Sequence, residues 1–273
     1  MRGRAPVPQA SLPPPSSKKE IITLHMTLDE ASPYTFKNLR RQLGLNRRRS
    51  PRPMWQQRLS ADSDFCHAVV GCGYLTREQM VRAAHRYRLG RSRTGGVIFW
   101  QIDMLDQIFD GKIMHYRPDC HRDKSRNPDW VSSALKRHYL HDDPRLAAGI
   151  ASAHCLFGTH LLACREPRLP VAVVEAEKTA VILSEHYPQY LWLAAGGLNE
   201  LSAVKLFPLR GHRILLFPDT DTDGKAYTTW YAVARKAEWL LGQPIAVSSL
   251  LERQATPGQK QRKIDLVDYL FEH

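Results

Sequence analysis

The sequence predicts an α/β protein whose C-terminal part, residues 166–273, holds a parallel sheet of about four strands flanked by helices. From Pro170 onward, short apolar runs alternate with segments of helical periodicity. This alternation is typical of a parallel sheet with helices on both faces, whose buried strands are continuous apolar runs. Two of the runs end in carboxylates, at the edge where an open α/β sheet binds its ligands.

Each predicted element of this C-terminal part follows from its residue pattern. The apolar runs predict four strands, at Val171–Val174, Tyr190–Ala194, Arg213–Phe217 and Ile245–Ser248. Helices are expected between and after them, at about Glu177–His186, Leu198–Phe207, Asp223–Leu241 and Leu266–Phe271. Asp265 precedes the last helix and is expected to cap it.

Residues 61–165 are predicted to form a smaller α+β region. Apolar residues at helical spacing predict a helix that ends at Gly71 and Gly73. Thr76 precedes Gln79 by three positions, a capping-box pattern that predicts the start of a second helix. Two strands follow, at 97–102 and 111–116, and Asp110-Gly111 between them is a hairpin-turn signal.

Residues 1–60 are predicted to be a largely disordered basic arm. The first 19 residues are rich in proline, whereas residues 28–45 favour a short basic helix. The arm holds twelve Lys and Arg against three acids, hence +9 of the net charge of +12. Such a segment suits a polyanion, because neutralising phosphates releases counterions, although a solvated tail without a specific role is the alternative. The candidate nucleic-acid contacts are Arg40, Arg41, Arg47, Arg48 and Arg49.

Composition excludes several classes of protein. No apolar run approaches the ~20 residues that span a bilayer, and the basic, proline-rich N-terminus lacks the apolar segment of a secretory signal. The five cysteines have no framework spacing, so we expect reduced thiols in a cytoplasmic protein. Without a CxxC pair, the sequence does not predict a zinc site.

The strongest chemical signal is a set of carboxylates after two strands. Glu175 follows Val171–Val174, and Asp219, Asp221 and Asp223 alternate after the strand at 213–217. Clustered carboxylates of this kind hold Mg²⁺, or Mn²⁺ in its place. The alternatives are a carboxylate favoured by a helix dipole for Glu175, and an ordinary Asp-rich turn with Asp223 as the helix cap.

Several neighbouring residues are candidates for binding phosphate. Gly196 and Gly197 follow the second strand, where their backbone N–H groups can approach a phosphate, although a plain strand-to-helix turn explains them equally well. Gly224 permits a tight turn beside the aspartates. Lys178 and Lys225 begin helices next to the carboxylates, and simple surface charges are the alternative for both.

The two carboxylate motifs resemble those of the Toprim domain, which topoisomerases, bacterial-type DNA primases and some nucleases share. Glu175 matches that family's lone Glu after the first strand, with Ala176 where the family usually has Gly. Asp219, Asp221 and Gly224 match its D-x-D-x-x-G motif. The order of segments is more specifically similar to a primase-related Toprim family of mobile elements, on the stretches 95–103 and 128–131 ahead of the first motif.

The resemblance implies a Mg²⁺-dependent enzyme of primase type that acts in the replication or mobilisation of DNA. Asp219, Asp221 and Asp223 would hold the metal, and Glu175 would be the catalytic acid, base or further ligand. Single-stranded DNA or RNA, nucleotides and a replicative helicase are the implied partners. Two alternatives stay open: a Toprim nuclease with the same carboxylates, and a non-catalytic module that binds nucleic acid or a replication partner.

Overall fold

The computed structural model describes residues 62–105, 108–139, 154–164 and 169–271. The predicted basic arm, with its short helix and five candidate arginines, lies outside these residues. In the described part, no helix has the length and apolar character needed to cross a membrane.

The N-terminal half consists of helices packed on an antiparallel sheet. Helices α2 (Asp64–Gly71) and α3 (Arg77–Tyr87) come first, and the predicted capping box of Thr76 and Gln79 starts α3. The sheet has the order β1-β2-β3-β4. Its strands are β1 (Gly90–Arg91), β2 (Val97–Ile102), β3 (Ile108–Met114) and β4 (Asp129–Trp130), followed by α4 (Val131–Tyr139) and the 3-10 helix η1 (Thr159–Cys164).

The C-terminal half is the predicted parallel sheet, with the order β6-β5-β7-β8. Its strands are β5 (Val171–Val174), β6 (Leu191–Ala194), β7 (Ile214–Phe217) and β8 (Ile245–Val247). Its helices are α6 (Glu177–His186), α7 (Ala203–Leu206), α8 (Lys225–Leu241), α9 (Leu250–Gln254), α10 (Pro257–Arg262) and α11 (Leu266–Phe271), with the 3-10 helix η2 (Phe207–Leu209) after α7. The fold class predicted from the sequence is therefore confirmed.

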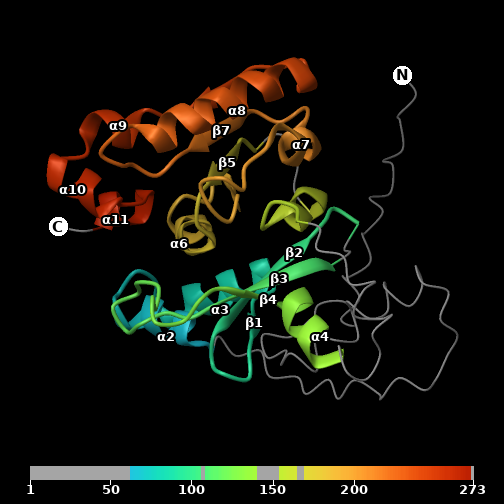
Figure 1. Cartoon of the computed structure of the whole chain (residues 1–273), viewed down its shortest axis with the longest axis vertical. Helices are drawn as coiled ribbons and strands as arrows, with labels where there is room; N and C mark the ends of the chain where they lie inside the picture. Colours follow the sequence, from blue (N-terminus) through green and yellow to red (C-terminus); the bar gives the residue numbers. More distant parts are fainter. Residues whose placement is uncertain (1–61, 106–107, 140–153, 165–168, 272–273) are drawn as a thin grey trace, which may run out of the picture.

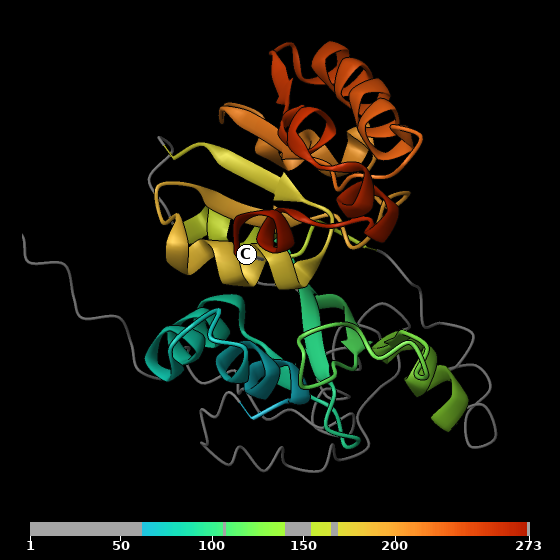
Figure 2. The same ribbon diagram turned by 90° about the vertical axis from the view of Figure 1, so that its left-hand side faces the viewer.

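Helix α6 lies between the two halves and joins them (Figures 1 and 2). One face of α6 packs on β5 and β6, and another packs on α3. Across the second contact, Arg82 and Arg86 of α3 both form ion pairs with Glu185, each at 2.8 Å. Tyr87 donates a hydrogen bond to the carbonyl of Trp192 at 2.8 Å. Because side chains from both halves share one hydrophobic core, the parallel sheet is held in place by the N-terminal elements.

Two details of the sequence prediction were wrong. Asp110 and Gly111 lie within β3, paired with Gln101 and Trp100, rather than in a hairpin turn. Gly111 is required there for packing, since a Cβ atom would come within 2.7 Å of the Trp100 ring. The helix expected at 198–207 is only one turn, α7, because Ser202 caps it by accepting a hydrogen bond from the Lys205 N–H.

Candidate active site

The carboxyl ends of β5, β6 and β7 meet at one edge of the parallel sheet. Val174 of β5 pairs with Ala194 of β6 on one side and with Phe217 of β7 on the other. Strand order reverses around β5, so this edge is a topological switch point, where α/β sheets bind ligands. Glu175 leaves the end of β5, and the chain reaches Asp219 two residues after the end of β7.

Glu175 and Asp219 interact electrostatically at this edge. Burial raises the pKa of Glu175 to about 6. Burial, and then the neighbouring Glu175 carboxylate, raise the pKa of Asp219 well above its ordinary value. Asp219 is thus a buried carboxylate beside a second carboxylate, an arrangement that favours either a proton or a cation between them.

Lys178 lies close to this pair but is bound to other acids. Its ammonium group forms ion pairs with Asp265 at 3.1 Å and with Asp268 at 3.2 Å, both on the C-terminal segment. Burial alone would lower the pKa of Lys178, but the two aspartates raise it well above its ordinary value. Since the Lys178 side chain is only 10% exposed, the interpretation as a surface charge is wrong. Lys178 therefore neutralises buried carboxylates.

Asp265 also caps the last helix, as predicted. The Asp265 carboxylate accepts a hydrogen bond from the Asp268 N–H at 2.9 Å, and the Asp268 carboxylate accepts one from the Asp265 N–H at 3.2 Å. The Thr179 hydroxyl donates to Asp265 at 2.7 Å. Helix α11 is thereby fixed to the start of α6, directly beneath the carboxylates at the sheet edge.

Asp221 and Asp223 have different environments. The Asp221 carboxylate accepts backbone hydrogen bonds from Asp223 at 3.0 Å, Lys225 at 2.9 Å and Ala226 at 2.8 Å. Although burial raises the pKa of Asp221, these three donors lower it below its ordinary value. Asp221, not Asp223, therefore caps α8. Asp223 is exposed and accepts a hydrogen bond from the Thr222 hydroxyl.

The structure does not gather the full set of predicted metal ligands. Among the described residues, no three His, Cys, Asp or Glu side chains are close enough to hold a metal ion together. Glu175 interacts electrostatically with Asp219, whose pKa it raises, and Asp221 in turn contributes to the raised pKa of Glu175. The oxygens of Asp221 are engaged by the backbone, and Asp223 points to solvent.

A buried ion pair connects the sheet edge to the N-terminal half. Lys112 of β3 lies 3.2 Å from the Glu177 carboxylate and donates a hydrogen bond to the Gly196 carbonyl at 2.6 Å. Gly196 has a positive φ of 93°, and a Cβ atom there would lie 3.2 Å from the Glu177 carboxylate. The Lys112–Glu177 pair thus explains the glycine at position 196 as well as the close approach of a phosphate would.

The remaining predicted phosphate contacts lie around the same edge. Gly197 follows Gly196, and Gly224 adopts a left-handed conformation with φ of 65° immediately before α8. Lys225 is exposed at the first position of α8.

A cleft of about 260 Å³ opens at this edge, between the parallel sheet and β3 with the loop that follows it. Acidic side chains, basic side chains and backbone atoms from both halves of the protein line this cleft. The lining residues are Lys112, Met114, Tyr116, Cys120, His121, Arg122, Glu175, Ala176, Glu177, Lys178, Gly196 and Gly197.

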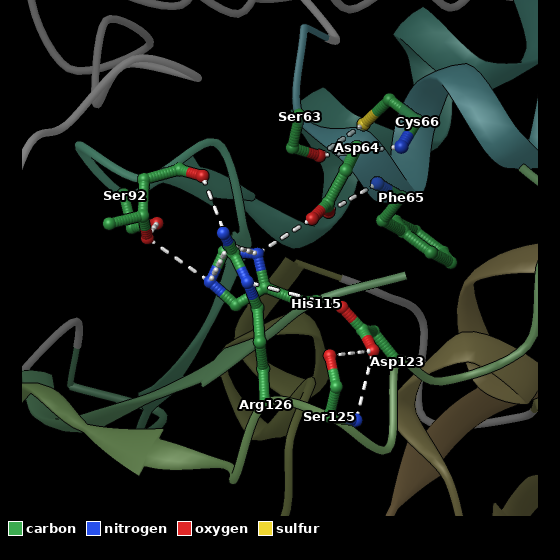
Figure 3. A network of polar contacts seen from close by, with 10 residues as sticks. Ser63, Asp64, Phe65, Cys66, Ser92, His115, Asp123, Ser125 and Arg126 are labelled. Atoms are coloured by element: carbon green, nitrogen blue, oxygen red, sulfur yellow. Dashed lines mark hydrogen bonds and ion pairs between the residues drawn. The ribbon is translucent and has the colours of Figure 1, made fainter. Parts of the chain in front are cut away.

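The loop that supplies Cys120, His121 and Arg122 is fixed by a polar network around His115 (Figure 3). His115 Nδ1 lies 2.8 Å from the Asp64 carboxylate, and Nε2 lies 3.1 Å from the Thr94 hydroxyl. Arg126 extends its guanidinium group over the His115 ring, and the Asp123 N–H donates to the His115 carbonyl at 2.8 Å. The basic wall of the cleft is therefore anchored to α2 and to the β1–β2 turn.

Comparison with known sequences places the chain in a family. Residues 65–220 match the profile of a domain of unknown function (DUF6371), over more than half of the chain. The chain belongs to the DUF6371 family. The match includes Lys112, Glu175 and Asp219, so both walls of the cleft fall within the DUF6371 domain.

A solved structure is also similar to this chain. The primase fragment of the bacteriophage T7 primase-helicase protein matches with a TM-score of 0.42 and 16% sequence identity. The match covers 71% of this chain and 66% of that one. No curated protein matches the chain.

Sequence reasoning missed several residues of this DUF6371 site. Lys112 and Glu177 are 65 positions apart, so their pairing depends on how the two halves pack. The only available local signal was a lysine within a predicted strand. The aromatic residues Phe99 and Trp100 of β2 are fully buried in the core, so their rings are not available to stack on bases.

Proposed function

We propose that this chain is a Toprim-type nucleic-acid enzyme in which Glu175 and Asp219 together bind one Mg²⁺ ion, with Mn²⁺ as a substitute. One observation carries the proposal. The two carboxylates leave neighbouring parallel strands at a topological switch point and interact there, beside a cleft lined by basic residues.

The residues present fit a magnesium ion. Mg²⁺ is bound in proteins by one or two carboxylates, and takes its other ligands from water and substrate phosphates. Two desolvated carboxylates repel each other unless a proton or a cation lies between them. When bound, the ion would neutralise negative charge on the phosphate oxygens of the substrate.

Other residues of the chain would prepare the site for a phosphate. Lys178 neutralises Asp265 and Asp268, which limits the negative charge beneath the metal ligands. Lys112 donates a hydrogen bond to the Gly196 carbonyl, which positions the backbone of the Gly196-Gly197 turn at the lining of the cleft. Glu175 would act with Asp219 as a ligand of the ion; in the protein without the ion, burial raises the pKa of Glu175 to about 6.

For the reaction, we propose nucleotidyl transfer of the primase type, on single-stranded DNA or RNA. The net charge of +12 and the Toprim resemblance support a polyanionic substrate. Action in the replication or mobilisation of DNA, with nucleotides as substrates and a replicative helicase as partner, rests on the resemblance.

One observation favours a second candidate, a non-catalytic nucleic-acid-binding module. Asp221 is the second aspartate of the D-x-D-x-x-G motif. Its carboxylate accepts hydrogen bonds from three backbone N–H groups. If Glu175 and Asp219 serve only to balance charge, the module would bind nucleic acid equally well with and without Mg²⁺.

The test is template-dependent incorporation of labelled nucleotides with Mg²⁺, in the wild type and in Glu175→Gln and Asp219→Asn. Asp223→Asn is the matched control, because Asp223 is an exposed acid of the same loop. We expect incorporation that both site variants abolish and the control retains. Loss of a labelled strand without added nucleotides would instead identify a nuclease. Absence of either activity, with binding independent of Mg²⁺, would support the non-catalytic module.

A further inference from the structure

The outer side of α8 carries a row of aromatic residues that the candidate active site does not use. Tyr227, Tyr231, Arg235 and Trp239 are spaced four apart along α8, and we call them the aromatic ridge. Residues at this spacing share one side of a helix. The inward side of α8 carries the buried residues Ala226, Trp230, Ala234, Ala237 and Leu241.

The aromatic ridge is exposed to an unusual degree. The Trp239 side chain is 87% exposed and Tyr231 is 45% exposed. Helix α8 forms the outermost layer of the C-terminal half, on the far side of the parallel sheet from α6 (Figure 1). Single exposed apolar residues are normal on a protein surface, but several in one row indicate an interaction site.

The aromatic ridge is also held in a defined geometry. The Tyr227 and Tyr231 rings are nearly parallel, with an angle of 27° between them and centroids 6.0 Å apart. The Arg235 guanidinium lies 4.8 Å above the Tyr231 ring. Arg235 is fixed in turn by the Ile245 carbonyl at 2.9 Å and the Glu238 carboxylate at 2.6 Å. The two tyrosine rings and Arg235 are therefore arranged before any partner binds, and Trp239 adds a ring that is largely exposed.

We infer that the aromatic ridge is a binding site for single-stranded nucleic acid, whose bases stack on its rings. Aromatic side chains interleaved with cations bind single strands because every base offers a π face and every nucleotide a phosphate. Lys225 and Lys236 are exposed on the same helix and supply charges for phosphates. Of the acids, Glu238 faces Arg235 and is paired with it.

The dimensions of the aromatic ridge suit a short strand. Twelve residues separate Tyr227 from Trp239, or about 18 Å of helix, which is the length of roughly five stacked nucleotides. Helix α8 begins at Lys225, beside the sheet edge that carries Asp219. A strand on the aromatic ridge would thus lead away from the candidate active site, yet its binding requires neither Glu175 nor Asp219.

The experiment compares two ligands by fluorescence anisotropy, in buffer with EDTA at physiological salt. One ligand is labelled oligothymidylate, and the other is an abasic oligonucleotide of the same length, which keeps the phosphates and lacks the bases. The variants are Tyr231→Leu with Trp239→Leu, which keeps apolar bulk but removes the rings, and Tyr231→Phe with Trp239→Phe, which keeps the rings. Leu240→Ala is the control for an exposed neighbour on α8.

We expect the wild type to prefer oligothymidylate over the abasic strand. The double leucine variant should lose about 5- to 150-fold in affinity for oligothymidylate for each stacked base lost, and nothing for the abasic strand. The phenylalanine variant and Leu240→Ala should keep the preference, and so should Glu175→Gln with Asp219→Asn. The last result separates this inference from the proposed function.

Three outcomes would overturn the inference. Equal affinity of the wild type for both ligands would show that bases do not contribute, and a preference that survives the leucine variant would place stacking elsewhere. If sedimentation shows a dimer that only the leucine variant breaks, while nucleic-acid affinity is unchanged, the aromatic ridge is a contact between two copies of the chain.

Discussion

Replacing Lys178 by methionine should destabilise the protein strongly and in a pH-dependent way. Lys178 is the cation that pairs with Asp265 and Asp268, and the side chains of all three are at most 12% exposed. Removing one partner from a buried ion pair costs about 3–5 kcal/mol, because the remaining charge stays buried. Here one methionine would leave two carboxylates without their ion-pair partner.

The pH dependence follows from the shifted pKa values. In the wild type, Asp265 has a lowered pKa, so its stabilising effect is present above pH 4 and is lost as the pH falls through that lowered pKa. Lys178 has a raised pKa, so it stays charged across the neutral range. Without Lys178, burial raises the pKa of the aspartates, and ionising them destabilises the variant as the pH rises. The loss should therefore be larger at pH 8 than at pH 5.

The assay is urea unfolding followed by tryptophan fluorescence, with the free energy of unfolding extrapolated to water at both pH values. Lys225→Met is the matched control, because Lys225 also begins a helix at the sheet edge but is exposed. An exposed substitution of this kind changes stability by about 0.5 kcal/mol or less. A loss for Lys178→Met that equals the control, or that is the same at both pH values, would refute the charge-balancing role.

Three further predictions use the same unfolding measurement. Gly196→Ala should lower the free energy of unfolding by about 1–3 kcal/mol. This loss should exceed that of Gly211→Ala, because Gly211 has a similar positive φ of 90° but open space around it. Equal losses would show that the contact with Glu177 does not matter. Asp221→Ala should lose about 1–2 kcal/mol through the cap of α8, whereas Asp223→Ala should change little; the reverse order would contradict the assignment of the cap. In EDTA, Glu175→Gln should raise the free energy of unfolding by about 1–2 kcal/mol at pH 8 and by little at pH 4.5. The reason is that the raised pKa of Glu175, about 6, makes its ionised form unfavourable in the folded protein above that pH. A gain independent of pH would contradict this raised pKa.

The parallel sheet could be predicted because its signal is local. Each strand is a short apolar run, and the structure has Glu175 and Asp219 just after the ends of the paired strands β5 and β7. The Thr76–Gln79 capping box and the Asp265 cap were also local signals, and both are present.

The errors arose where distant parts of the chain decide the local structure. Asp110-Gly111 has the composition of a turn, but the Trp100 ring on the paired strand fills the space that a side chain at 111 would need. The Asp-rich loop offered three equivalent acids, and only its folded path shows that Asp221 turns toward backbone N–H groups. The Lys112–Glu177 pair depends on how the halves pack, which no short motif encodes.

The most direct test of the central claim is calorimetric titration of Mg²⁺ into the full chain. It should be made on the wild type, on Glu175→Gln with Asp219→Asn, and on Asp223→Asn, each with and without single-stranded DNA. The account predicts saturable binding in the wild type and in Asp223→Asn, strengthened by DNA, and none in the double variant. Binding that survives the double variant, or no binding to the wild type even with DNA present, would contradict a metal site at Glu175 and Asp219.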